Sequence, residues 1–286
     1  MRAGADARAV AEGRVFVGRQ RAVQETQEVR PGDDVFIASP ASSPDDAVNV
    51  LVRTGDLVAA DKPAGIPTIA DHGGATGALV ARVARALGVS PSRVHPTSRL
   101  DRDVSGVVVF SLTGAATRRL TDARARGAYE RRYVAIASRE PAPERGTWDA
   151  PIGRAADPRL RAAGGRDAVP AQTRYAMCGR AAGSAALLAV APLTGRTHQI
   201  RVHAATAGAA LVGDRAYGGP TRLTLQSGRV VEPRRVALHA ARVVVPDENG
   251  RPLVVTAAVP PALVELWSSL GGDAAAWELS TSCALG

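Results

Sequence analysis

Residues 98–110, SRLDRDVSGVVVF, run from a charged turn directly into an apolar strand. The β-branched and aromatic run at 107–110 is typical of a buried strand. Asp101 stands between Arg99 and Arg102, and positive neighbours favour the ionised form of a carboxyl group. A carboxylate held charged at the edge of a strand can act as a nucleophile or a general base. The alternative is a solvated loop whose local ion pairs stabilise the protein little.

On both sides of this stretch, many short apolar runs predict strands. A smaller number of amphipathic runs predict helices. Because the strands outnumber the helices and do not alternate regularly with them, we expect an α+β fold on a mostly antiparallel sheet rather than a doubly wound parallel sheet. The pair Asn249-Gly250 is a turn signal that favours a hairpin. The expected strands are 14–17, 35–37, 57–60, 107–110, 133–137, 172–177, 187–193, 243–245 and 253–256, the last two being paired across that turn.

Three helices are expected between these strands. Residues 76–87 carry apolar side chains on one face and end at a glycine. Thr113 is positioned to cap a second helix that continues to about Arg126 and exposes a basic face. A third helix is expected from about Thr197. Aromatic residues make up only 3% of the chain, so the core must consist mainly of Val, Leu, Ile and Ala.

The chain is expected to divide into four parts. Pro, Ser and Asp dominate residues 40–50, a composition typical of a linker. Residues 1–39 form a small β-rich module before it, and 51–270 form the main domain after it. The final stretch, 271–286, is expected to be a fraying tail.

The charge balance favours a polyanionic partner. The chain has 36 basic and 27 acidic residues, a net charge of +9. Such an excess favours nucleic acid through counterion release. Lys62 is the only lysine, and arginine suits contacts with phosphates and bases better than lysine does. The alternative explanation is the codon usage of a genome rich in alanine and arginine.

Two further features bear on the compartment. No apolar run approaches the roughly 20 residues that cross a bilayer, and the first residues lack the apolar stretch of a signal peptide. Cys178 and Cys283 have no metal-ligand spacing and are expected to be unpaired thiols. We therefore expect a cytoplasmic protein.

Residues 192–208, PLTGRTHQIRVHAATAG, place a second charged cluster at the start of the third helix. His198 and Arg201 are three apart and share a face, so Arg201 can point into a cleft. His198 and His203 are five apart, about 140° around a helix, which disfavours a metal-binding pair. For either histidine, a structural hydrogen bond is the alternative to catalysis.

Taken in order, these segments resemble the RluA-type family of pseudouridine synthases. Residues 57–68, LVAADKPAGIPT, look like the strand and Lys-Pro-x-Gly entry of that family. The stretch 98–110 looks like its His-Arg-Leu-Asp-x-x-x-Ser-Gly segment. Further matches are RRYVAIA at 131–137, which is similar to a Lys-x-Tyr strand, GRTHQIRVH at 195–203, GDRAYGG at 213–219 and LHA at 238–240.

The resemblance implies a fold, an activity and a set of site residues. The fold would be a pseudouridine-synthase-like domain on a mixed, mostly antiparallel sheet with flanking helices and a central cleft. The activity would be the isomerisation of uridine to pseudouridine in ribosomal or transfer RNA, by a monomer and without cofactor or metal. Asp101 would be the catalytic carboxylate, Arg201 its ion-pair partner, and Tyr133 the residue that stacks on the flipped uracil. The substrate-binding residues would be Arg99, Arg102, Lys62, Arg196, His198, Arg131 and Leu238.

The chain departs from the family pattern in three places. Residues 1–39 resemble the second half of the small RNA-binding module named after ribosomal protein S-four, without its first helix. Arg131 replaces the usual lysine and keeps its charge. Ser98 replaces the usual histidine, which removes an aromatic ring beside the nucleophile and can alter substrate positioning or rate. Because neither substitution changes the three catalytic positions, we expect an active enzyme.

Two other interpretations stay open at this point. A non-catalytic RNA-binding protein would explain the charge, with Ser98 marking a decayed site. A glycoside hydrolase using Asp101 and Asp103 would need two carboxyl groups flanking one sugar bond. The chain lacks the glycine-rich motifs of dinucleotide and nucleoside-triphosphate sites and the Gly-x-Ser-x-Gly turn of serine hydrolases. Those three classes therefore lose their main support.

Overall fold

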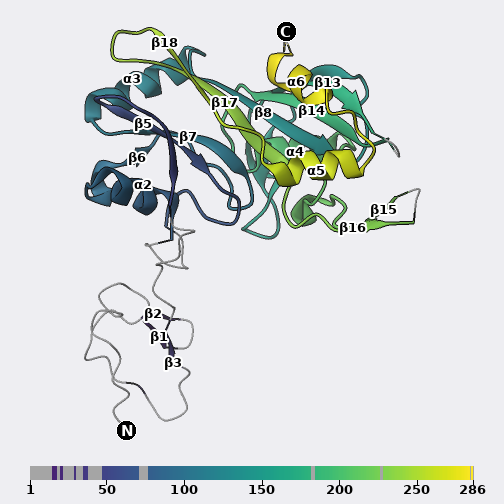
Figure 1. The fold of residues 1–286 in the computed structure, drawn as a ribbon, viewed down its shortest axis with the longest axis horizontal. Coiled ribbons are helices and arrows are strands. Elements are labelled where there is room, and N and C mark those ends of the chain that lie inside the picture. The colour runs from purple at the N-terminus through teal and green to yellow at the C-terminus, as the bar shows by residue number, and fades with distance from the viewer. Residues whose placement is uncertain are drawn as a thin grey trace.

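The structure, a computed structural model, describes residues 15–17, 20–21, 29, 35–37, 47–70, 77–181, 184–225, 228–283 and 285. Among these residues, ten strands form one mixed sheet (Figure 1). Its order is β4-β5-β7-β17-β8-β14-β13-β9, while β18 pairs with β17 and β6 with β7. The strands are β4 Asn49–Arg53, β5 Leu57–Lys62, β6 His95–Pro96, β7 Ser105–Ser111, β8 Glu130–Ala137, β9 Arg145–Trp148, β13 Thr173–Arg180, β14 Ala186–Pro192, β17 Leu238–Pro246 and β18 Pro252–Thr256.

The pairing in this sheet is mostly antiparallel. Strands β17 and β7 run parallel, and the other neighbours described in the sheet are antiparallel. The predicted hairpin forms between β17 and β18, with Val243 opposite Val255. The expectation of an α+β fold on a mixed, mostly antiparallel sheet is therefore confirmed.

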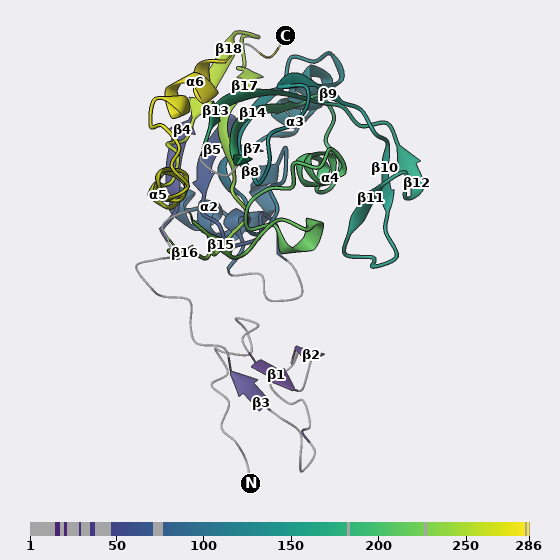
Figure 2. The same cartoon turned by 90° about the vertical axis from the view of Figure 1, so that its right-hand side faces the viewer.

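Alternate side chains of the central strands face two different cores, as the two-residue period of a strand requires. In β7, Val108 packs with α2 and α4, whereas its neighbour Val107 packs with α3. In β8, Ile136 packs with Trp267 of α5. Figure 2 shows α4 on one side of the sheet and α5 with α6 on the other. The helices are α2 Leu79–Leu87, α3 Gly114–Ala125, α4 Gln199–Thr206, α5 Pro261–Ser269 and α6 Ala276–Ser282.

Local hydrogen bonds set the helix ends. The hydroxyl of Thr113 accepts the backbone N–H of Ala116 at 3.2 Å, so α3 begins where the sequence predicts. Helix α2 begins at Leu79, and the start expected at residue 76 lies outside the described residues; the N–H of Leu79 donates to the carbonyl of Pro67 at 2.9 Å. This bond ties the start of α2 to the loop after β5. The helix ends at Gly88 in the left-handed conformation.

Three smaller sheets complete the described structure. The strands predicted at 14–17 and 35–37 pair antiparallel, with Val15 opposite Ile37. Most of the linker expected at 40–50 lies outside the described residues, and β4 begins within it. The small sheets are β2-β1-β3, with β1 Val15–Val17, β2 Gln20–Arg21 and β3 Val35–Ile37; β11-β10-β12, with β10 Ile152–Arg154, β11 Arg161–Ala163 and β12 Arg166–Val169; and β15-β16, with β15 Leu223–Thr224 and β16 Val230–Val231.

The C-terminal stretch does not fray as expected. Helix α6 lies within 271–286, and Ala276 at its start is buried in the cluster that contains Trp267. The indole N–H of Trp267 donates to the carbonyl of Asp273 at 2.8 Å. The stretch packs on the main domain because its small residues approach Trp267 closely: a Cβ atom at Gly272 would come within 2.0 Å of the indole ring. No helix within the described ranges has the length and apolar character needed to span a membrane.

Candidate active site

A pocket of about 700 Å³ opens where the loop before β7, strand β8 and the start of α4 meet. All but one of the expected site residues line it, and they come from segments far apart in the chain. The main lining residues are Thr68, Ser98, Arg99, Asp101, Arg102, Arg124, Arg131, Tyr133, Arg196, His198, Arg201 and Leu238.

Asp101 and Arg201 face each other in this pocket. Nη1 of Arg201 donates to Oδ2 of Asp101 at 2.9 Å. The side chain of Asp101 is 26% exposed and that of Arg201 is 11% exposed. The carboxylate therefore keeps access to the pocket while its partner is largely buried, and a charge-assisted bond holds it in place.

The strand that follows Asp101 fixes the position of its loop. Gly106 lies where β7 passes β17, and a Cβ atom there would come within 2.2 Å of the carbonyl oxygen of Ala240. Its φ of +116° also lies in the region that favours glycine. The preceding residue, Ser105, contacts Nδ1 of His239 at 2.7 Å. The Ser-Gly pair thus lets two buried strands approach closely beside the pocket.

A second carboxylate orients Arg201. Asp214, whose side chain is 1% exposed, accepts from Nε at 2.8 Å and from Nη2 at 2.7 Å of the guanidinium. The ring of Tyr217, in the short helix η4 (Arg215–Tyr217), lies 4.9 Å from the same guanidinium. Sequence reasoning assigned no role to Asp214 or Tyr217, although the segment 213–219 that holds them was noted as a family match.

His198 lies immediately before α4 and beside Asp101. Its backbone is in the left-handed conformation, with φ 57°. Nδ1 contacts the hydroxyl of Tyr217 at 2.6 Å, and Nε2 lies 3.8 Å from Oδ2 of Asp101. Burial lowers the pKa of His198, which favours its neutral form. His203 has both ring nitrogens within 2.9 Å of protein oxygens, so it has a structural role.

Tyr133 and Leu238 form the apolar wall of the pocket. Both are less than 10% exposed, and both belong to the apolar cluster beneath the pocket. Burial raises the pKa of Tyr133, so its hydroxyl stays protonated at neutral pH. An apolar wall with one aromatic ring suits a flat heterocycle.

Two arginines of the site also hold loops. Nη2 of Arg131 donates to the carbonyls of Pro192 at 3.0 Å and Thr194 at 2.8 Å. Nε of Arg196 donates to the carbonyl of Pro170 at 3.0 Å. Arg131 is buried and Arg196 is exposed, so Arg196 has the freer guanidinium.

Arg124 is a pocket residue that sequence reasoning placed only on a basic helix face. It is exposed on α3, lies 4.6 Å over the ring of Tyr129, and donates to the carbonyl of Thr97 at 2.6 Å. The hydroxyl of Ser98 lies 3.4 Å from the Tyr129 hydroxyl. A cation and an aromatic ring thus flank the position where Ser98 replaces the usual histidine.

Lys62 does not lie at the pocket, contrary to expectation. The side chain is fully buried, and its Nζ donates to the carbonyls of Pro63 at 2.9 Å, Ile66 at 2.7 Å and Arg102 at 2.9 Å. The turn after β5 supplies the carbonyls of Pro63 and Ile66, and the loop of Asp101 supplies that of Arg102. Lys62 therefore holds the loop that carries Asp101 and is not available to bind substrate.

The second carboxyl group needed by a glycoside hydrolase is missing from the pocket. Asp103 is exposed and does not line it, and Asp101 is the only acidic residue among the described lining residues. Two carboxyl groups flanking one sugar bond are therefore not formed here.

Comparison with known proteins gives consistent results. The family described as RNA pseudouridylate synthase matches residues 56–206. An uncharacterized RNA pseudouridine synthase of Chloroflexus aurantiacus is 37% identical over 257 residues, which cover 85% of this chain and 78% of the relative. The ribosomal large subunit pseudouridine synthase D of Xanthomonas campestris is 36% identical over 246 residues, covering 82% and 73%. The solved structure of human RNA pseudouridylate synthase domain containing 4 has the same fold, with a TM-score of 0.63 at 22% identity over 79% of this chain and 94% of that one.

Proposed function

The chain belongs to the RNA pseudouridylate synthase family, and on this premise we propose how its pocket performs the reaction. The protein is an RNA pseudouridine synthase, an isomerase, and its motifs are of the RluA type. In this reaction the bond between C1′ and N1 of a uridine breaks, and a bond between C1′ and C5 forms. The proton lost from C5 is balanced by one gained at N1. The non-catalytic alternative is not retained.

The single observation that carries the proposed site is the ion pair between Asp101 and Arg201 at the pocket. We assign Asp101 as the catalytic carboxylate, which attacks the sugar or the base or assists departure of the base. A carboxylate without a partner in a dry pocket would become protonated and lose its function. Arg201 supplies the opposite charge and a charge-assisted hydrogen bond of 2.9 Å that holds the Asp101 carboxylate at the pocket.

Tyr133 is assigned to hold the uracil and to serve the proton step at C5. Its buried ring lies in the apolar wall, where a base extruded from RNA would stack. Because burial keeps the phenol protonated, the hydroxyl acts as a hydrogen-bonding and relay group rather than as a phenolate.

The exposed arginines around the mouth of the pocket, here called the cationic rim, are assigned to bind the phosphates of the RNA backbone. A uridine stacked in RNA must be flipped into the pocket, which costs a few kcal/mol of unstacking. Contacts between rim arginines and phosphates offset this cost. The rim arginines assigned to this role are Arg99, Arg102, Arg124 and Arg196.

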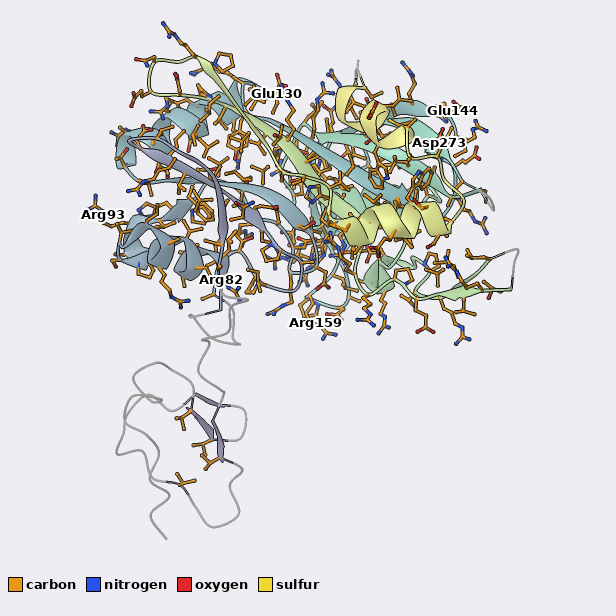
Figure 3. The ribbon with its side chains drawn as sticks, in the orientation of Figure 1. Arg82, Arg93, Glu130, Glu144, Arg159 and Asp273 are labelled. Atoms are coloured by element: carbon orange, nitrogen blue, oxygen red, sulfur yellow. The ribbon has the colours of Figure 1, made fainter. Side chains whose placement is uncertain are left out.

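A second basic surface extends beyond the pocket on the β10-β11-β12 sheet. Arg154 and Arg166 are exposed on it. Arg159, labelled just below the main domain in Figure 3, lies in the turn between β10 and β11 and pairs with Asp157. RNA longer than the flipped nucleotide would reach these side chains.

Ribosomal RNA is the proposed substrate, with transfer RNA as the alternative. One relative that covers most of this chain is named a ribosomal large subunit pseudouridine synthase. The module at 1–39 resembles an RNA-binding unit of a ribosomal protein, which supports the same choice. We also propose that the protein acts on its RNA as a monomer in the cytoplasm.

The proposed domain division is the one expected from the sequence, with one change. A partial RNA-binding module at 1–39, a linker at 40–50 and a catalytic domain from 51 are kept. Because α6 packs on the main sheet, the catalytic domain extends beyond residue 270.

The test is to map pseudouridines by carbodiimide-blocked primer extension in RNA from cells with and without this gene. Signals that vanish with the gene and return with the wild-type chain identify the RNA and the uridine. Asp101→Asn should fail to restore them, with turnover reduced at least about a hundredfold, while its RNA affinity stays close to that of the wild type. Identical maps in the two strains would contradict the substrate proposal.

A further inference from the structure

The hydroxyl of Tyr217 joins two parts of the protein at the edge of the pocket. It accepts the backbone N–H of Arg161, the first residue of β11, at 3.0 Å. The same oxygen lies 2.6 Å from Nδ1 of His198. One hydroxyl therefore contacts both the β10-β11-β12 sheet and the imidazole beside Asp101.

These contacts favour one of the two neutral tautomers of His198. The Tyr217 oxygen accepts the Arg161 N–H, and its one proton needs an acceptor; among the described contacts of this hydroxyl, only Nδ1 of His198 can accept it. The hydroxyl proton of half-buried Tyr217 finds its acceptor at Nδ1, and a separation of 2.6 Å suits an O–H donor. A neutral imidazole that accepts at Nδ1 carries its proton on Nε2.

Nε2 is the nitrogen that faces Asp101. Its separation from Oδ2 is 3.8 Å, too long for a direct hydrogen bond. The donor is therefore available to an acceptor atom of a nucleotide bound beside the carboxylate, such as a uracil carbonyl or a ribose hydroxyl. Arg201 already occupies the other approach to the same oxygen, at 2.9 Å.

We propose that Tyr217 is a positioning residue that fixes the Nε2–H tautomer of His198, so that this imidazole donates to the substrate next to Asp101. The inference rests on the proposed catalytic role of Asp101. It goes beyond that role because it assigns a hydrogen-bond donor and the residue that sets it. The anchoring of Arg161 to the same hydroxyl also places the β10-β11-β12 sheet against the donor.

The surroundings of His198 favour the neutral form that this role needs. Burial acts most strongly, and the positive charges of Arg201 and Arg161 act in the same direction. The carboxylates of Asp101 and Asp214 act in the opposite direction. The donor is thus a neutral N–H rather than a second cation competing with Arg201.

The first test reads the tautomer without any RNA. Long-range proton–nitrogen NMR of the full chain, with His198→Asn used to assign the ring signals, should show a protonated Nε2 and an unprotonated Nδ1 at neutral pH. Tyr217→Phe keeps the ring under Arg201 and removes only the hydroxyl, so it should give a mixture of tautomers. A wild-type signal with the proton on Nδ1 would overturn the proposal.

The second test measures turnover on total RNA from cells that lack the gene, at the uridines the wild-type chain modifies. Tyr217→Phe should lower the single-turnover rate at least about tenfold, with little change in RNA affinity. Tyr175→Phe is the matched control, because that buried hydroxyl donates to the carbonyl of Pro143 at 2.9 Å and lies outside the pocket lining. It should leave the rate unchanged.

Two variants of His198 separate the donor from the contact with Tyr217. A glutamine places its amide nitrogen near the position of Nε2, so His198→Gln should keep part of the single-turnover rate. In that background, adding Tyr217→Phe should change the rate no further. An asparagine reaches only the position of Nδ1 and tolerates the left-handed backbone. His198→Asn should therefore keep the contact with Tyr217 but lose the rate.

Each failure has a separate signature. A wild-type rate in Tyr217→Phe, or an equal effect of that substitution in the His198→Gln background, overturns the role of Tyr217. An RNA sample that the wild-type chain itself does not modify counts against the proposed substrate, and the NMR result still decides the tautomer.

Discussion

Arg201 and Asp214 form a two-bond ion pair, with Nε to Oδ2 at 2.8 Å and Nη2 to Oδ1 at 2.7 Å. This pair uses two of the three guanidinium nitrogens and fixes the plane of the group. The remaining nitrogen, Nη1, then meets Asp101 at 2.9 Å. A planar fork is needed for this geometry, which explains why arginine and not lysine stands here.

The first prediction concerns the loss of this fork. Arg201→Ala leaves the buried Asp214 without a partner, and breaking such a pair costs about 3–5 kcal/mol of unfolding free energy. Arg201→Lys keeps one charge but cannot contact both carboxylates, so turnover should fall roughly a hundredfold with a smaller loss of stability. Urea unfolding and single-turnover kinetics measure the two effects. A fully active Arg201→Lys enzyme would show that the fork is not needed.

The second prediction separates Lys62 from the arginines proposed to bind RNA. Lys62→Met removes the three hydrogen bonds from Nζ to loop carbonyls, each worth about 1 kcal/mol, so the free energy of unfolding should fall by about 3 kcal/mol. Turnover should fall because the loop of Asp101 loses its anchor, while RNA affinity stays unchanged. Arg196→Met, at the exposed rim, should show the reverse pattern: RNA binding becomes weaker and less salt-dependent, while the free energy of unfolding changes little because the lost bond to Pro170 is exposed. Reduced RNA affinity in Lys62→Met would restore the ligand role expected from sequence.

Local patterns predicted the parts of the fold that depend on neighbours in the chain. The cap of α3 needs only Thr113 and the N–H of Ala116 three residues later. The hairpin of β17 and β18 needs a turn signal between two apolar runs. Such elements can be read from the sequence because their decisive contacts lie within a few residues.

The site depends on contacts that no local pattern contains. Asp101 and Arg201 are 100 residues apart, and only the resemblance to a family placed them together. Lys62 was assigned to the substrate only through the Lys-Pro-x-Gly motif that the chain shares with the family. The Lys62 side chain points away from the pocket because its amine donates to the carbonyl of Arg102, 40 residues away in the chain. Asp214 gave no local signal either, since burial and a distant arginine define its role.

The third prediction concerns the hydroxyl of Tyr133. Tyr133→Phe keeps the apolar wall and the stacking ring, so RNA affinity and stability should stay close to those of the wild type. Turnover should fall roughly a hundredfold if the hydroxyl serves the proton step at C5. A deuterium isotope effect measured with uridine labelled at C5 should increase in the variant, because proton removal becomes slower. Unchanged turnover would leave Tyr133 with stacking alone.

The last prediction concerns a buried histidine behind the pocket. His239 is fully buried on β17, and burial lowers its pKa to about 4. Arg235 donates to the hydroxyl of Ser105 at 2.8 Å, so that hydroxyl donates in turn to Nδ1 of His239. Protonation of His239 would turn Nδ1 into a donor that faces the Ser105 hydroxyl, whose oxygen already accepts from the Arg235 cation. The folded state therefore resists a proton that the unfolded chain takes up at about pH 6.5.

The stabilising contribution of neutral His239 is complete above pH 6.5 and is lost as the pH falls towards 4. Below about pH 4 the folded state takes up the proton too, and the loss stops. Over this window the free energy of unfolding should fall by about 3 kcal/mol on account of His239 alone. Urea unfolding at several pH values should show a shallower acid slope for His239→Asn, whose amide oxygen still accepts from Ser105. His95→Asn, at an exposed position, is the control. Equal slopes in the wild type and His239→Asn would mean that His239 is already charged in the folded protein.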